Sequence, residues 1–83
     1  MEKEKVNLSV KIYNDTYVLR TSADEQQVLQ IAAQVDARMH KLAEGKNIQK
    51  VEKLAVWTAL DLAADLVDLQ KRYDRLLAAL RER

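Results

Sequence analysis

Residues 61–80 read DLAADLVDLQKRYDRLLAAL, with leucine or tyrosine at positions 62, 66, 69, 73, 76 and 80. The intervals alternate between four and three residues, which is the heptad spacing of a helix that packs along a narrow seam against another helix. Leu62, Leu69 and Leu76 occupy the d positions of this repeat, and Leu66, Tyr73 and Leu80 the a positions. The stretch therefore predicts a helix whose apolar seam needs a partner.

A single chain of 83 residues has nothing to cover this seam. The sequence has no proline and one glycine, so a second helix is predicted over 48–83, about 50 Å long at ~1.5 Å per residue. A compact domain of this size is only about 30 Å across, so the helix should project by roughly 20 Å. Six large residues represent on the order of 10 kcal/mol of unused burial. We predict self-association through the apolar residues Leu62, Leu66, Leu69, Tyr73, Leu76, Leu77 and Leu80.

The details of this association stay open between a dimer and a tetramer. Pairing of Asp65 with Arg72 of another copy favours an antiparallel contact, because both residues fall at the g position of the heptad. Exposed charge pairs are worth less than about 1 kcal/mol, so the preference is small.

The first twenty residues predict a β-hairpin. Apolar side chains alternate with polar ones at positions 6–12, and a β-rich run follows at 17–19. Asn14 and Asp15 tolerate the left-handed backbone of a two-residue turn, so we expect the turn there. This turn places Tyr13 opposite Thr16 and Val10 opposite Leu19.

Two helices should follow the hairpin. Ser22 and Glu25 form a capping box for a helix at about 23–44, and Gly45 ends it. Asn47 is expected to cap the second helix. The first helix carries the apolar stripe Val28, Ala32, Val35, Met39 and Leu42, widened by Ile31. The second helix begins with a broad apolar face expected to be buried: Leu54, Ala55, Val56, Ala59, Leu60, Leu62, Ala63 and Val67.

These elements define an α+β fold with an N-terminal β-hairpin, one medium helix and a long C-terminal helix forming an intermolecular coiled coil. We expect a disordered tail at 1–5, a small head at 6–67 and a projecting coiled-coil segment at 68–83.

The composition argues against enzymatic chemistry. There is no cysteine, and the one histidine, His40, is expected at the surface, so no catalytic triad, cofactor site or thiolate metal site is predicted. Asp61, Asp65 and Asp68 share a helix face that we interpret as solvated. The net charge of +1 favours neither nucleic acid nor a membrane surface, and the absence of cysteine and of a signal sequence favours the cytoplasm.

Polar and basic residues gather near the turn between the predicted helices. The basic residues are Arg38, Lys41, Lys46, Lys50 and Lys53, and Asn47 lies among them. It is interpreted either as ordinary surface charge or as a docking face for an acidic protein.

Three segments together resemble the ZapA family of bacterial cell-division proteins. They are VNLSVKIYNDTYVLRTSADE at 6–25, IAAQVDARMHKLAE at 31–44 and EKLAVWTALDLAADLVDL at 52–69. The resemblance implies a non-enzymatic protein that binds the tubulin-like GTPase FtsZ and cross-links or bundles its protofilaments at midcell. It also implies a head built by two chains and a coiled coil joining dimers into a tetramer.

One departure from the family bears on where FtsZ would bind. The family often has glycine and a basic residue at the hairpin turn, where this chain has Asn14 and Asp15. We therefore place the expected docking face on the helix–helix turn and the adjacent first helix, around Arg38, Lys41, Lys46, Asn47 and Lys50. The alternative function is a small DNA-binding dimer of the ribbon–helix–helix type, which the hairpin and the near-neutral charge disfavour.

Overall fold

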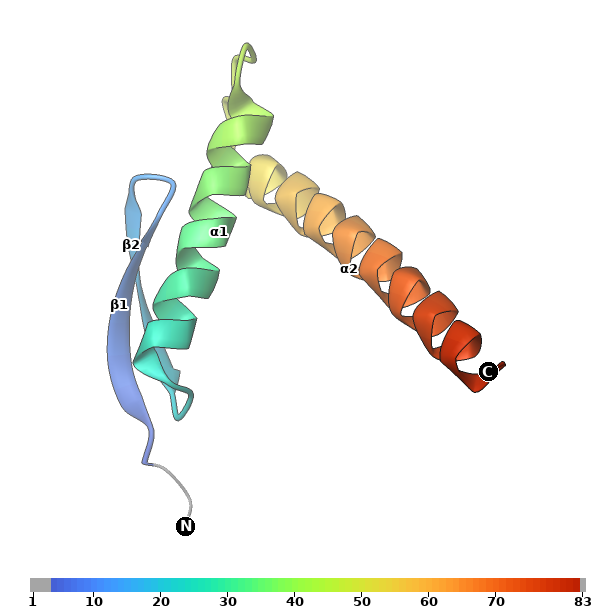
Figure 1. Cartoon of the computed structure of the whole chain (residues 1–83). Helices are drawn as coiled ribbons and strands as arrows, with labels where there is room; N and C mark the ends of the chain where they lie inside the picture. Colours follow the sequence, from blue (N-terminus) through green and yellow to red (C-terminus); the bar gives the residue numbers. More distant parts are fainter. Residues whose placement is uncertain (1–3, 83) are drawn as a thin grey trace. The chain divides into compact units, whose positions relative to one another are not determined.

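The computed structural model describes residues 4–82. It contains an antiparallel hairpin of β1 (Val6–Ile12) and β2 (Asp15–Thr21), then helix α1 (Glu25–Ala43) and helix α2 (Val51–Arg81) (Figure 1). The predicted hairpin, medium helix and long helix are confirmed. The chain divides into two compact units between residues 49 and 50, and each unit is described by itself. Residues 1–3 of the expected tail, and the predicted helix end at residue 83, lie outside the described residues.

The hairpin turn is one residue earlier than predicted. Ile12 pairs with Asp15, and Tyr13 and Asn14 form the turn with positive φ angles of 50° and 67°. Positive φ at both central residues is characteristic of a type I′ turn. The predicted register is therefore wrong, since Val10 lies opposite Tyr17 rather than Leu19. Each partner on β2 moves by two residues, so the predicted apolar face is preserved.

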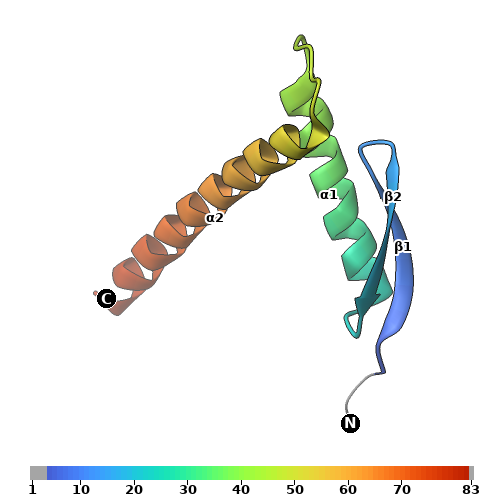
Figure 2. The same ribbon diagram turned by 180° about the vertical axis from the view of Figure 1, so that it is seen from behind.

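Helix α1 packs on β1 of the hairpin, and two opposite views show it alongside the strands (Figures 1 and 2). Val10, Ala32 and Met39 are buried. The other members of the predicted stripe, Val28, Val35 and Leu42, are half-buried. Ile31 does not widen the buried stripe as predicted, because it is 54% exposed.

The ends of α1 differ from the prediction at one side only. The helix begins at Glu25 with Asp24 as N-cap and no side-chain capping bond, so the capping box from Ser22 does not form. Thr21 Oγ1 instead accepts a hydrogen bond from the Ala23 amide at 3.0 Å. At the other end Gly45 has φ +69°, which confirms its role in ending the helix.

Helix α2 has 31 residues and is about 47 Å long. It begins after Lys50, which makes no side-chain capping bond, so the predicted cap at Asn47 is wrong. Leu54 and Thr58 are buried, and the Thr58 hydroxyl donates a 2.8 Å hydrogen bond to the Leu54 carbonyl. The remaining broad apolar face is largely exposed, contrary to prediction, as Val56 at 62% and Leu60 at 66% illustrate. None of the described helices is long and apolar enough to cross a membrane.

Candidate functional site

The predicted seam is an exposed apolar strip on α2. With about 100° of rotation per residue, the six seam residues fall within roughly 80° of the helix circumference. Leu62 is half-buried, and Leu66, Leu69, Tyr73, Leu76 and Leu80 are 52% to 61% exposed. Leu77 lies at one border of the strip and is half-buried. The helix thus presents the aligned apolar side chains that a second helix would cover.

A second apolar strip occupies the opposite side of the first half of α2. Val56, Leu60 and Val67 are 62%, 66% and 49% exposed and lie about 140° around the helix from the seam. The same side carries Lys71 and Asp74 further along, so this strip ends at Val67 while the seam continues. Residues 56–67 therefore have apolar side chains on two sides, whereas the following turns have them on one.

Beside the seam, Arg72 pairs with an acidic residue of its own helix. Arg72 forms a 3.0 Å ion pair with Asp68 one turn earlier, and the two side chains are 72% and 61% exposed. Such an exposed pair contributes below about 1 kcal/mol, so Arg72 can exchange it for a carboxylate on another copy at small cost. The antiparallel pairing of Asp65 with Arg72 stays a prediction.

The predicted docking residues surround the end of α1 and the loop that follows. Arg38 is half-buried, and Lys41, Lys46, Asn47 and Lys50 are exposed. The Lys46 amide donates to the Ala43 carbonyl at 3.1 Å, which ties the start of the loop to the helix end. Lys50 is the N-cap of α2 and belongs to the second unit, while the other four residues belong to the first.

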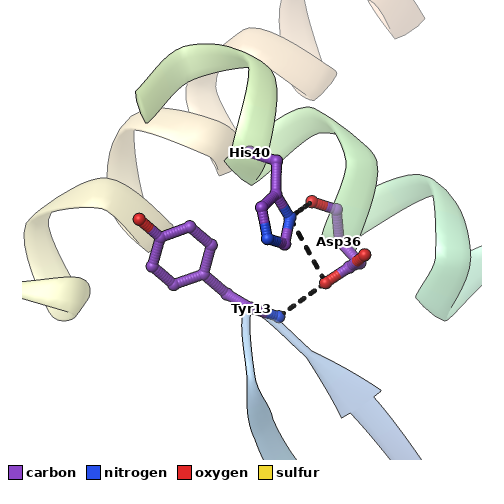
Figure 3. A network of polar contacts seen from close by, with 3 residues as sticks. All are labelled: Tyr13, Asp36 and His40. Carbon is purple, nitrogen blue, oxygen red and sulfur yellow. Dashed lines mark hydrogen bonds and ion pairs between the residues drawn. The ribbon is translucent and has the colours of Figure 1, made fainter. Parts of the chain in front are cut away.

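A polar cluster that the sequence did not predict joins the hairpin tip to α1. Tyr13 comes from the turn, and Asp36 and His40 come from successive turns of α1 (Figure 3). The Tyr13 amide donates a 2.7 Å hydrogen bond to Asp36 Oδ1, and the Tyr13 and His40 rings lie 4.9 Å apart at 49°. His40 is exposed, as predicted, but it has these specific partners.

The cluster also determines which nitrogen of His40 carries a proton. Nδ1 lies 2.8 Å from the Asp36 carbonyl oxygen, which can only accept, so Nδ1–H is the donor. Nδ1 is also 3.5 Å from Asp36 Oδ1. Asp36 therefore holds the hairpin tip through its carboxylate and the imidazole through its backbone carbonyl.

This anchoring explains the position of the turn. A bulky residue with positive φ such as Tyr13 is disfavoured by about 1–2 kcal/mol. The bond from the Tyr13 amide to a carboxylate offsets that cost, because hydrogen bonds to charged groups are the stronger class. The one available sequence signal is the placement of Asp36 and His40 four residues apart beside the apolar stripe, which does not identify the partner.

The described residues contain no group of three or more His, Cys, Asp or Glu side chains placed to hold a metal ion.

Comparison with known proteins identifies the family. The model of the family "Cell division protein ZapA" matches residues 8–83. The chain belongs to the ZapA family. A Cell division protein ZapA from Geobacillus thermodenitrificans is 36% identical over 80 residues, covering 96% of this chain and 88% of the relative. One from Geobacillus kaustophilus is 33% identical, covering 94% of this chain and 86% of the relative.

Two solved structures share the fold. One, described as a ZapA mutant dimer from Geobacillus stearothermophilus, has a TM-score of 0.73 and 34% identity, with 96% of this chain and 93% of that chain covered. A conserved bacterial protein from Pseudomonas aeruginosa has a TM-score of 0.75 at 23% identity, with coverage of 93% and 86%, and shows the fold alone. The resemblance read from the three sequence segments is therefore confirmed, and it gives the chain a role in cell division.

Proposed function

We propose that this chain is a non-enzymatic accessory protein of cell division that self-associates through α2 and cross-links FtsZ protofilaments at midcell. The observation that carries the proposal is the exposed seam, with five large side chains at least half exposed along one side of a helix. A relative of 34% identity is described as a dimer, which supports the self-association. The FtsZ partnership rests on membership of the ZapA family.

Cross-linking requires two binding heads held at a defined separation. We propose that residues 6–67 form the head and residues 68–83 the segment that joins copies. Two weak contacts made by linked heads gain strongly in avidity, because the second contact forms at a high effective concentration. A monomer would bind a filament without connecting it to another.

The proposed docking face is the basic group at the end of α1 and in the following loop. Lys41, Lys46 and Asn47 are exposed in the first unit, where positive charge would attract an acidic surface of FtsZ and speed the encounter. The proposal involves no nucleic acid, membrane or cofactor, and it places the protein in the cytoplasm at the division ring.

Co-sedimentation with FtsZ polymers tests the role of the seam. Leu69→Glu combined with Leu76→Glu should abolish association through the seam, and bundling with it, because two charges would enter the seam, while single-head binding remains. The matched control is Lys71→Glu with Ala78→Glu, which has the same seven-residue spacing on the exposed opposite side. Bundling by a seam variant proven monomeric by light scattering would refute the mechanism.

The docking face needs a separate test. Lys41→Glu combined with Lys46→Glu should weaken FtsZ binding several-fold with no change in oligomeric state. Lys71→Glu with Arg75→Glu makes the same charge change on α2 and should leave binding nearly intact. Equal loss in the two double variants would show that overall charge, not this face, governs binding.

A further inference from the structure

The outer edge of strand β2 is an unprotected pairing surface. In the type I′ turn the Asp15 amide bonds back to the Ile12 carbonyl, so these residues form a hydrogen-bonded pair. Bonded and non-bonded pairs alternate along an antiparallel ladder, so the backbone groups of Thr16, Val18 and Arg20 point away from β1. The 3.0 Å bond from the Thr16 amide to its neighbour Asp15 Oδ1 agrees with this direction.

Side chains on β2 are also incompletely covered. Tyr17 and Leu19 lie on the same sheet face as the buried Val10 but are 44% and 41% exposed, because α1 packs on β1. On the other face Val18 is 65% exposed, and the residues beside it on that face of the strand, Thr16 and Arg20, are polar. A long edge strand without proline or a bulge is a template for another strand.

We propose that β2 pairs antiparallel with β2 of a second copy, centred on Val18, to form a four-stranded sheet across two chains. A two-fold axis perpendicular to the sheet at Val18 overlaps all seven residues of both strands. It places Tyr17 opposite Leu19 of the other copy, twice, and Val18 opposite Val18. Tyr17 and Leu19, on the sheet face that α1 packs against, then gain apolar neighbours, and so does Val18 on the opposite face.

The backbone geometry permits this register, and the residue pairing and strand overlap favour it over the registers centred on the adjacent residues. Centring on Val18 brings outward-pointing residues opposite each other, with Val18 bonded to Val18 and Arg20 to Thr16. A register centred on Tyr17 places Leu19 opposite Asp15, and one centred on Leu19 reduces the overlap to five residues. The Val18 register also separates the two Arg20 side chains by about 14 Å along the strands.

A second copy fits this edge because the strand is complementary to itself. Apolar residues meet apolar residues, no like charges lie opposite each other, and the outward-pointing amides and carbonyls of each chain can bond to those of the other. This pairing is a contact separate from the α2 seam. It rests on the proposed function only because both contacts join copies of this chain.

Cysteine cross-linking of the full chain tests the pairing directly. In a bonded antiparallel pair the Cα atoms lie about 5.5 Å apart, within disulfide range, and the chain has no other cysteine. Val18→Cys should therefore form a disulfide-linked dimer in most molecules under mild oxidation. The matched control is Ser9→Cys, because Ser9 lies directly opposite Val18 on β1 and presents the other sheet edge. Thr16→Cys is a second control, since the two Thr16 residues would lie about 14 Å apart.

The expected result is at least tenfold faster cross-linking of Val18→Cys than of either control, with unchanged circular dichroism. Mixing Thr16→Cys with Arg20→Cys chains should also yield cross-linked dimers, because these residues are opposite in the proposed register. A Val18→Cys chain that stays monomeric, or controls that cross-link at the same rate, would overturn the pairing.

Amide hydrogen exchange on the unmodified chain provides a second readout. Val18 and Arg20 amides should exchange at least tenfold more slowly than those of Ser9 and Lys11 on the β1 edge. Equal exchange at the two edges would overturn the proposal. Both measurements are made without FtsZ, so a failure to bind FtsZ leaves them unaffected, and a failed cross-link leaves the co-sedimentation result intact.

Discussion

Removing the Asp36 carboxylate should detach the hairpin tip from α1 and lower the stability of the chain. Asp36→Ala leaves the Tyr13 amide without its 2.7 Å acceptor in a residue that already has φ 50°. The backbone carbonyl of Asp36 is retained, so the His40 Nδ1–H bond survives. The substitution therefore isolates the hairpin anchor from the rest of the cluster.

The magnitude follows from the contacts. A hydrogen bond to a charged group contributes about 1.5–3 kcal/mol, and 37% exposure of the Asp36 side chain favours the lower part of that range because solvent screens it. Replacing aspartate by alanine inside a helix returns about 0.5 kcal/mol of helix propensity. The free energy of unfolding should fall by about 1–1.5 kcal/mol, which corresponds to a Tm lower by about 5–10 °C in a domain of this size.

Urea and thermal unfolding at one fixed protein concentration measure this change, since association would make Tm depend on concentration. Asp74→Ala on the exposed part of α2 is the matched control, because it has the propensity gain without the hairpin bond. Asp36→Asn keeps an acceptor oxygen and should lose about half as much stability as Asp36→Ala. If Asp36→Ala and Asp74→Ala unfold with the same free energy, the hairpin anchor is not a stabilising contact and the reasoning is refuted.

Three further substitutions test separate features by the same unfolding measurements. Gly45→Ala should cost about 1 kcal/mol from φ +69° alone, because nothing lies within 4 Å of an added Cβ; an unchanged stability would argue against the left-handed helix end. Leu54→Ala should cost about 2–5 kcal/mol because Leu54 is 1% exposed, and a loss below about 1 kcal/mol would contradict its burial. Arg72→Ala should change the unfolding free energy by less than about 0.5 kcal/mol, because its pair with Asp68 is exposed; a larger loss at a protein concentration where the chain is monomeric would contradict that estimate.

The alternation of residues 6–12 was sufficient to predict the hairpin and its apolar face, but not its register. A turn at Asn14 and Asp15 satisfies local preferences better than one at Tyr13 and Asn14, because aspartate tolerates positive φ more readily than tyrosine. The actual turn depends on Asp36, which lies 23 residues from Tyr13. A tertiary hydrogen bond overrode local turn chemistry, and such a bond leaves no periodic signal.

The helix ends show a similar limit. Gly45 was predicted correctly because a left-handed residue after a helix has few alternatives to glycine. Ser22 and Asn47 were plausible caps, yet the helices begin after Asp24 and Lys50 without side-chain capping bonds. Polar residues suitable for capping are common in loops, so their presence predicts a nearby helix start better than its exact position.

The sequence predicted the seam for a different reason: its spacing requires no knowledge of any other part of the chain. The same periodicity says nothing about Val56, Leu60 and Val67, which the prediction assigned to the interior and which are about half exposed or more. A broad apolar face indicates that burial is needed, but not whether the same chain or another copy provides it. Periodicity therefore located the exposed strip on α2, but it could not decide whether Val56, Leu60 and Val67 are buried within one chain.

The distribution of apolar residues links folding to association. Among the described residues the buried hydrophobic side chains are Val10, Ala32, Met39 and Leu54, whereas many apolar side chains on α2 and β2 remain substantially exposed. So small a core rarely supplies more than about 3–5 kcal/mol on its own. Each strip covered by a second copy would add apolar burial to this small core. Under the proposed self-association, the stability of the fold is then inseparable from chain concentration, because the surfaces that join copies are also the largest reserve of apolar burial in the molecule.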